Sequence, residues 1–167
     1  MAHMQRLLAN VLGGWFHLRR CFPASLLDEM AQVITAGESR HRGEVRFAIE
    51  ARLSPLAVLD GLDAHTRATQ VFAQLRVWDT EHNSGVLFYV LMAEHRIEIV
   101  ADRGIAGRVA QVEWDAICAR MRAHFAAGRW REGSLEGIDA AHALLARHFP
   151  SDGRDNPDEL PGRPVVL

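Results

Sequence analysis

The sequence predicts an α/β fold, a three-layer α/β/α sandwich with a small mixed sheet. Apolar residues recur with helical spacing in four segments, and three other segments show the alternating or continuous apolar pattern of strands. The predicted order is α-β-α-β-β-α-α, and this mixture of helices and strands favours helices on both faces of one sheet. The 167 residues, 49% apolar and 24% charged, suffice for one hydrophobic core and exclude a largely disordered chain.

The first predicted helix covers residues 25–38, where leucine, methionine, valine and isoleucine follow helical spacing after Pro23. Residues 44–50 then alternate between charged and apolar side chains. That period predicts a strand with one face buried and one face exposed to water. Pro55 is expected to end this segment.

A second helix is predicted over residues 63–77, and a polar loop follows it up to Gly85. Residues 86–92 are continuously apolar, as in a central strand covered on both faces. Residues 96–101 alternate again, and the connection of only three residues predicts a hairpin, so these two strands should be antiparallel.

Two more helices are predicted over residues 112–127 and 135–149, with Gly128 able to end the first of them. Cys118 lies on the apolar stripe of the 112–127 helix and is therefore expected in the core. We divide the chain into an N-terminal helical segment (1–23), an α/β domain (24–149) and a Pro- and Asp-rich tail (150–167). The tail is expected to lack a core of its own. It is interpreted either as a docking segment or as a disordered end.

The N-terminal segment is too short in its apolar part, residues 7–12, to span a bilayer. We predict a short amphipathic helix with Trp15 and Phe16 resting on the domain. The alternative is a peripheral membrane contact through residues 5–20, which Arg19 and Arg20 would permit.

Charge and cysteine content narrow the classes of function. The net charge of -2 provides no overall field to attract nucleic acid or an anionic membrane. Cys21 and Cys118 lie far apart with no CxxC spacing, so neither a disulfide framework nor a thiolate zinc site is predicted, and we expect a reducing, cytoplasmic location. The nine histidines include no HExxH pair, which disfavours a zinc hydrolase.

The order of motifs resembles a known family. A glycine-bounded loop and apolar strand (NSGVLFYV, 83–90) precede a basic turn with an alternating strand (HRIEIV, 95–100) and the loop RGI (103–105). FAAGRW (125–130) and a helix containing Gly133 and Gly137 follow. This resembles the TPM domain, in the compact bacterial form without signal peptide or membrane anchor, over roughly residues 24–149.

The resemblance implies weak acid phosphatase activity with binding of a divalent metal, often calcium, and association with membrane protein complexes. The sequence also departs from the family pattern. The loop at 101–106 reads ADRGIA where the family has Gly-aromatic-Gly-Leu-Glu, and residues 78–82 read WDTEH where many members are glycine-rich. Family ligand positions are therefore not transferred to this chain.

Three polar loops are expected to meet at one end of the sheet, because the second and third strands are antiparallel and the first strand can run parallel to the second. They are residues 38–44, 79–83 and 102–104. Carboxylate and amide oxygens there suit Ca²⁺ or Mg²⁺, with no organic cofactor. The predicted metal ligands are Glu38, Asp79, Glu81, Asn83 and Asp102, with Glu44 as a further donor.

Phosphate chemistry at the same loops would use Asp79, Asp102 and Arg103 as the catalytic residues. Two sets of side chains could assist them: Arg40 and Arg42 by holding a phosphoryl group, and His41 or His82 by moving protons. A plain ion-pair network among the charged side chains of these loops is the alternative. Trp78 is expected to anchor its loop by packing.

We therefore expect a module for binding or assembling with an unknown protein partner, which can hold a divalent cation at a loop edge. The alternative function is a weak, metal-assisted acid phosphatase that acts on phosphate monoesters.

Overall fold

The computed structural model describes residues 2–12, 14–151 and 160–167. Four strands form one mixed sheet in the order β3-β2-β1-β4. They are β1 (Glu44–Glu50), β2 (Gly85–Leu91), β3 (Arg96–Ala101) and β4 (Val165–Val166). β1 runs parallel to β2 and to β4, whereas β2 and β3 form the predicted antiparallel hairpin.

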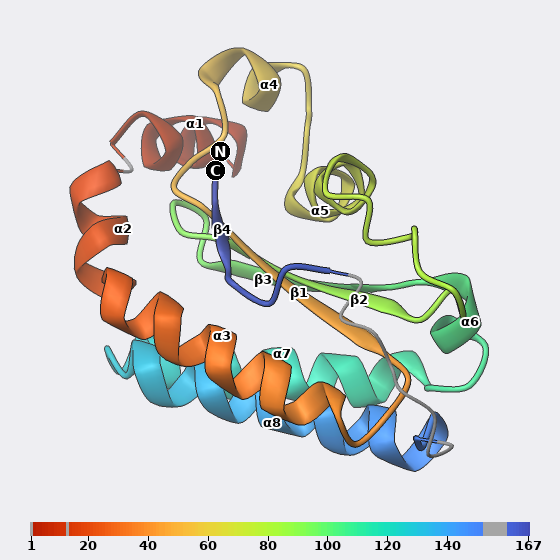
Figure 1. Cartoon of the computed structure of the whole chain (residues 1–167). Helices are drawn as coiled ribbons and strands as arrows, with labels where there is room; N and C mark the ends of the chain where they lie inside the picture. The colour runs from red at the N-terminus through yellow and green to blue at the C-terminus, as the bar shows by residue number, and fades with distance from the viewer. Residues whose placement is uncertain (1, 13, 152–159) are drawn as a thin grey trace.

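Helices cover both faces of this sheet, which confirms the predicted α/β class (Figure 1). One face packs against α2 (Trp15–Cys21), α3 (Ala24–Glu38), α7 (Gln111–Ala126) and α8 (Trp130–His148). The other packs against α1 (Ala2–Leu12), α4 (Pro55–Leu59) and α5 (Ala64–Gln74). The short α6 (Arg103–Ala106) directly follows β3.

β2 is the central strand that its apolar sequence predicts, and all seven of its residues are buried. Its side chains alternate between the two layers. Phe88 stacks on Phe47 of β1 at 5.5 Å between ring centroids on one face, whereas Leu87 and Tyr89 join the core beneath α5 on the other.

The prediction of a half-exposed β1 is wrong, because all seven of its residues are buried. α5 and the C-terminal segment cover the charged face. Arg46 donates from Nη1 to the carbonyl of Arg163 at 3.0 Å. Glu50 accepts two bonds from Arg67, at 2.8 and 3.0 Å, and one from the Tyr89 hydroxyl at 2.6 Å. Buried polar groups are tolerated when they are bonded in this way.

The C-terminal tail also departs from expectation, because its last residues join the core of the domain. Leu160 is buried, and β4 pairs with Ala48 and Ile49 of β1. The amide of Leu167 donates to the carbonyl of Ile49 at 2.9 Å. The expectation of a docking or disordered segment falls partly on residues 152–159, which lie outside the described residues.

Three of the predicted helices correspond closely to α3, α5 and α7, and Gly128 follows α7 with a φ of +73°. α8 begins at Trp130, earlier than predicted. Pro55 starts α4 instead of ending a segment: the Ser54 hydroxyl caps that helix by accepting the amide of Ala57 at 3.2 Å. Proline suits this first position because it needs no amide donor there.

The N-terminal segment forms two helices, but Trp15 and Phe16 do not rest on the domain as predicted. Both side chains are exposed, and Leu18 and Cys21 are the buried residues of α2. Trp78, predicted to anchor its loop, is also half exposed. Within the described residues, no helix combines the length and apolar character needed to cross a membrane.

Candidate functional site

The three polar loops meet at one end of the sheet, as the strand order predicts. β1 and β2 begin side by side, with Glu44 opposite Gly85, and β3 ends beside the start of β2, with Ala101 opposite Val86. The amide of Glu44 donates to Ser84 at 3.0 Å, and that of Asp102 donates to Gly85 at 2.8 Å. We call residues 38–44, 79–84 and 102–104 the loop edge.

Asn83 and Arg103 are brought together at the loop edge and bond to each other. The Arg103 guanidinium donates to Asn83 Oδ1 from Nε at 3.1 Å and from Nη2 at 2.9 Å. The amide of Gly104 donates to the Asn83 carbonyl at 3.1 Å. A Cβ on Gly104 would lie only 2.5 Å from that carbonyl oxygen, so glycine permits this close approach.

The predicted acidic ligands take different positions. Glu38 is buried, and its Oε1 accepts the amide of Val45 at 2.9 Å. Asp102 caps α6, with Oδ1 accepting the amide of Arg103 at 2.7 Å. Asp79 and Glu81 are exposed. In the part of the chain that the structure describes, no three His, Cys, Asp or Glu side chains cluster to hold a metal ion. The cation site stays a prediction.

One oxygen at the loop edge is unusual. Asp102 is buried, and its Oδ2 has no hydrogen-bond partner among the described residues. A buried carboxylate oxygen without a partner is costly, so this atom is suited to a cation or a donor group from outside the described residues.

The two histidines of the loop edge differ in exposure, and His41 is too deeply buried to exchange protons with a substrate. His41 Nδ1 accepts the amide of Gly43 at 3.1 Å, and its Nε2 lies 2.7 Å from Nδ1 of the equally buried His142. Burial lowers the pKa of His41 to about 4. Burial, then the charges of His41 and Arg40, lower the pKa of His142 to about 3. The other proposed proton carrier, His82, is exposed.

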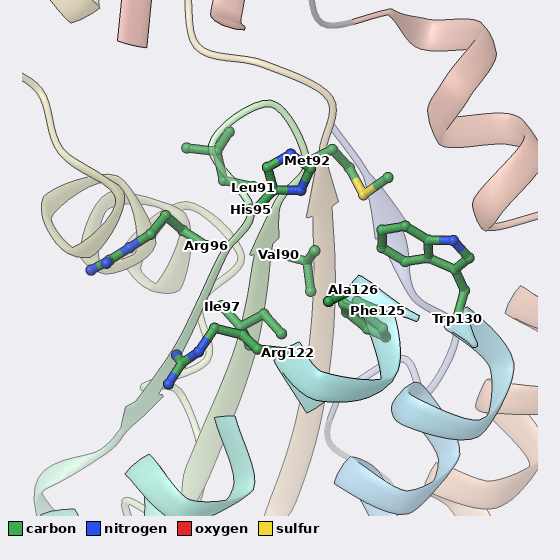
Figure 2. A pocket seen from close by; sticks show the side chains of 10 residues that line it. All are labelled: Val90, Leu91, Met92, His95, Arg96, Ile97, Arg122, Phe125, Ala126 and Trp130. Carbon is green, nitrogen blue, oxygen red and sulfur yellow. The ribbon is translucent and has the colours of Figure 1, made fainter. Parts of the chain in front are cut away.

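The opposite end of the sheet holds an apolar pocket of about 250 Å³, beside the β2–β3 turn and the junction of α7 with α8. We call it the hairpin pocket. Its apolar lining includes Val90, Met92, Ile97, Phe125, Ala126 and Trp130. Figure 2 shows Trp130 and Met92 on one side of it and the basic Arg96 and Arg122 on the other.

Local chain geometry shapes this pocket. The positive φ of Gly128 permits the tight connection between α7 and α8, so Trp130 packs against Phe125 with ring centroids 4.7 Å apart. Phe22 contacts the same indole at 5.7 Å. At the turn, His95 adopts a φ of +51° and lines the pocket with an exposed side chain.

Sequence reasoning missed the hairpin pocket because its apolar residues have the spacing of ordinary core residues. The available signal was the pair of aromatic residues around Gly128, together with the basic residues of the turn. Arg96 donates to Glu98 at 3.1 Å. Arg122 makes no ion pair with any residue that the structure describes.

Comparisons with known proteins agree with the fold. The TPM domain matches residues 21–144 of this chain. The NMR structure of BA42 protein from the psychrophilic bacterium Bizionia argentinensis is similar, with a TM-score of 0.76 and 28% sequence identity, over 86% of this chain and 94% of that chain. A comparison with curated proteins finds no match. Because the match spans most of the chain, from the end of α2 into α8, this protein belongs to the TPM domain family.

Proposed function

We propose that this protein is a protein-binding module that receives an apolar side chain of its partner in the hairpin pocket, next to a partner carboxylate. One observation carries the proposal: an apolar pocket is lined on one side by exposed basic side chains. Interface anchors are commonly aromatic or aliphatic side chains seated in pockets of this kind.

The size of the pocket favours a side chain over a large cofactor. Pockets for small molecules usually measure about 300–1,000 Å³, and the hairpin pocket has about 250 Å³. That volume suits one or two apolar groups. The rings of Phe125 and Trp130 favour an aromatic group, which can pack against them in an offset or edge-to-face arrangement.

The positive charge around the pocket favours a partner in which an acidic group lies next to the bound apolar side chain. Arg122 and His95 line the pocket with exposed side chains, and Arg122 has no ion-pair partner among the described residues. An arginine can hold a carboxylate through two parallel hydrogen bonds. The preferred partner motif is therefore an aromatic residue beside an acidic residue or at a chain end.

N-acetyl-tryptophan and N-acetyl-tryptophan amide test this chemistry, because they differ only in the carboxylate. We expect both to shift the NMR signals of Ala126 and Trp130, with the acid binding several-fold more tightly. Arg122→Gln should remove the preference for the acid, whereas Arg120→Gln on the same helix should retain it.

A blocking variant has a matched control in the neighbouring residue. Ala126→Phe should fill the pocket and abolish the shifts, whereas Ala127→Phe should leave them unchanged, because Ala127 is exposed and does not line the pocket. Shifts that are absent in the wild type, or that survive in Ala126→Phe, would refute the proposal.

The second candidate is binding of Ca²⁺ or Mg²⁺ at the loop edge, which the unpartnered, buried Oδ2 of Asp102 supports. Calorimetric titration of the wild type should show binding that Asp102→Asn weakens at least tenfold. Asp115→Asn is the control, since Asp115 is an exposed residue of α7 whose carboxylate accepts a bond from Gln111 at 3.0 Å. Equal affinity in Asp102→Asn would place any bound cation elsewhere.

Metal-assisted hydrolysis of phosphate monoesters, the alternative function, depends on that cation to neutralise developing charge. Hydrolysis of p-nitrophenyl phosphate should then require Ca²⁺ or Mg²⁺ and fall in Asp102→Asn and Asp79→Ala. Rates that these substitutions leave unchanged would identify a contaminating phosphatase.

A further inference from the structure

Helix α1 is attached to the domain through its polar side. Arg6 donates to both carboxylate oxygens of Glu94 at 3.0 Å. Asn10 is fully buried: its Nδ2 donates to Glu94 at 2.8 Å, and its Oδ1 accepts the amide of Leu53 at 2.7 Å. These bonds hold α1 in one orientation, with Arg6 and Asn10 facing inward beside the half-buried Leu7.

The opposite side of the same helix is apolar and exposed. Met4, Leu8 and Val11 expose 67%, 58% and 49% of their surface. In α2, Trp15 and Phe16 are also exposed, to 45% and 89%, and we call these five residues the apolar row. A helix of a water-soluble domain normally turns its apolar side to the core and its polar side to water. In α1, Leu7 packs against the core, but Met4, Leu8 and Val11 face outward, so this outward side is suited to an apolar surface outside the protein.

Charge distinguishes between the surfaces that could cover this row. Residues 1–27 contain no aspartate or glutamate, although the whole chain has a net charge of -2. Beside the row, Arg19 and Arg20 are both exposed, and the Arg19 guanidinium lies 5.1 Å from the ring centre of Trp15. A second copy of this chain would bring like charges together, whereas an anionic surface would complement them.

We propose that α1 and α2 bind the surface of an anionic lipid bilayer. The row of Met4, Leu8, Val11, Trp15 and Phe16 enters the interface between headgroups and acyl chains, where tryptophan and phenylalanine are favoured. Arg19 and Arg20 contact the anionic headgroups, as basic residues next to membranes do. This contact uses neither the hairpin pocket nor the loop edge.

Co-sedimentation of the full chain with lipid vesicles tests the proposal. One vesicle preparation contains phosphatidylcholine with 30% phosphatidylglycerol, and the other contains phosphatidylcholine alone. We expect at least tenfold stronger binding to the anionic vesicles, weakened by added salt because the attraction is partly electrostatic. Arg19→Gln with Arg20→Gln should lower binding to the anionic vesicles toward that of phosphatidylcholine alone.

Two pairs of substitutions compare the apolar row with residues of the same type elsewhere that are at least as exposed. Trp15→Ser should weaken vesicle binding at least fivefold, and Trp78→Ser should not, although the two side chains are exposed to 45% and 50%. Val11→Ser should also weaken binding, whereas Val112→Ser on α7, exposed to 70%, should leave it unchanged. Because all four residues are exposed, the variants are expected to fold, which circular dichroism checks.

Several results would overturn the proposal. One is the failure of folded wild-type protein to sediment with anionic vesicles. Another is an equal loss of binding in the control variants. A third is a lipid-free dimer, seen by analytical ultracentrifugation, that Trp15→Ser dissociates, because a second copy would then cover the apolar row.

Discussion

The loop edge and the hairpin pocket lie at opposite ends of the β1–β2 pair, and they differ in how their polar groups are used. At the loop edge, Glu38 bonds to the backbone of β1, and Arg103 bonds to Asn83. At the hairpin pocket, Arg122 is exposed beside an apolar cavity. Polar loops therefore indicate where strand ends converge, but an accessible binding site depends on which groups the tertiary structure leaves unbonded.

The largest expected effect is a loss of stability at acidic pH, which depends on the buried histidines at the loop-edge end of the sheet. Folded His41 and His142 have pKa values lowered to about 4 and about 3, so below pH 6.5 the unfolded chain binds more protons than the folded chain. Stability should fall as the pH falls, by about 2 kcal/mol for each histidine between pH 7 and pH 5. Urea unfolding at a series of pH values measures this loss.

His142→Gln separates the contributions of the pair, because only His41 then titrates in this range at that position. The dependence of stability on pH should become about half as steep. An unchanged slope would mean that other groups govern the acid sensitivity of the fold.

A somewhat smaller effect compares two glycines of the same end. A Cβ on Gly85 would lie 1.9 Å from the backbone oxygen of Val77, so Gly85→Ala must displace main chain and should cost about 3 kcal/mol. Gly107 has its nearest neighbour at 3.9 Å and a φ of -79°, so Gly107→Ala should stabilise by about 0.5 kcal/mol. Thermal unfolding of both variants checks the opposite signs; similar losses would contradict the close packing at Gly85.

The smallest effects are expected at two exposed positions, Phe16 on α2 and Ala126 at the hairpin pocket. Phe16→Ala and Ala126→Phe change exposed positions, so each should alter the free energy of unfolding by no more than about 0.5 kcal/mol. Urea unfolding of both variants measures this change in the free energy of unfolding. A loss of several kcal/mol in Phe16→Ala would show that the ring packs on the domain after all.

The order of the predicted helices and strands could be derived from the sequence because β2 is continuously apolar and the buried residues of α7, such as Trp114, Ile117 and Met121, recur at helical spacing. The burial of β1 could not be predicted from the sequence. Its charged residues have the pattern of an exposed face, but distant partners help to make their burial tolerable: Arg67 of α5 bonds Glu50, and the carbonyl of Arg163 near the C-terminus bonds Arg46. β4 was missed because two residues are too few to show a period.

The candidate sites show the same division between local and long-range information. The convergence of the three loops follows from strand directions alone, and the pairing of Asn83 with Arg103 confirms it in detail. The hydrogen-bond partners of the side chains could not be predicted from the sequence. The bond between His41 and His142, for example, joins residues 101 positions apart in the chain. The hairpin pocket arises from the packing of Trp130 near the turn, which no local pattern specifies.

The buried contact between Tyr89 and Glu50 provides an optical signal of sheet integrity. Tyr89 is the only tyrosine of the chain, and burial together with the bond to Glu50 raises the pKa of its phenol far above the ordinary value. Intact protein should therefore show no tyrosinate absorbance in moderately alkaline solution. An increase in that absorbance would report the separation of β1, β2 and α5, without any added label.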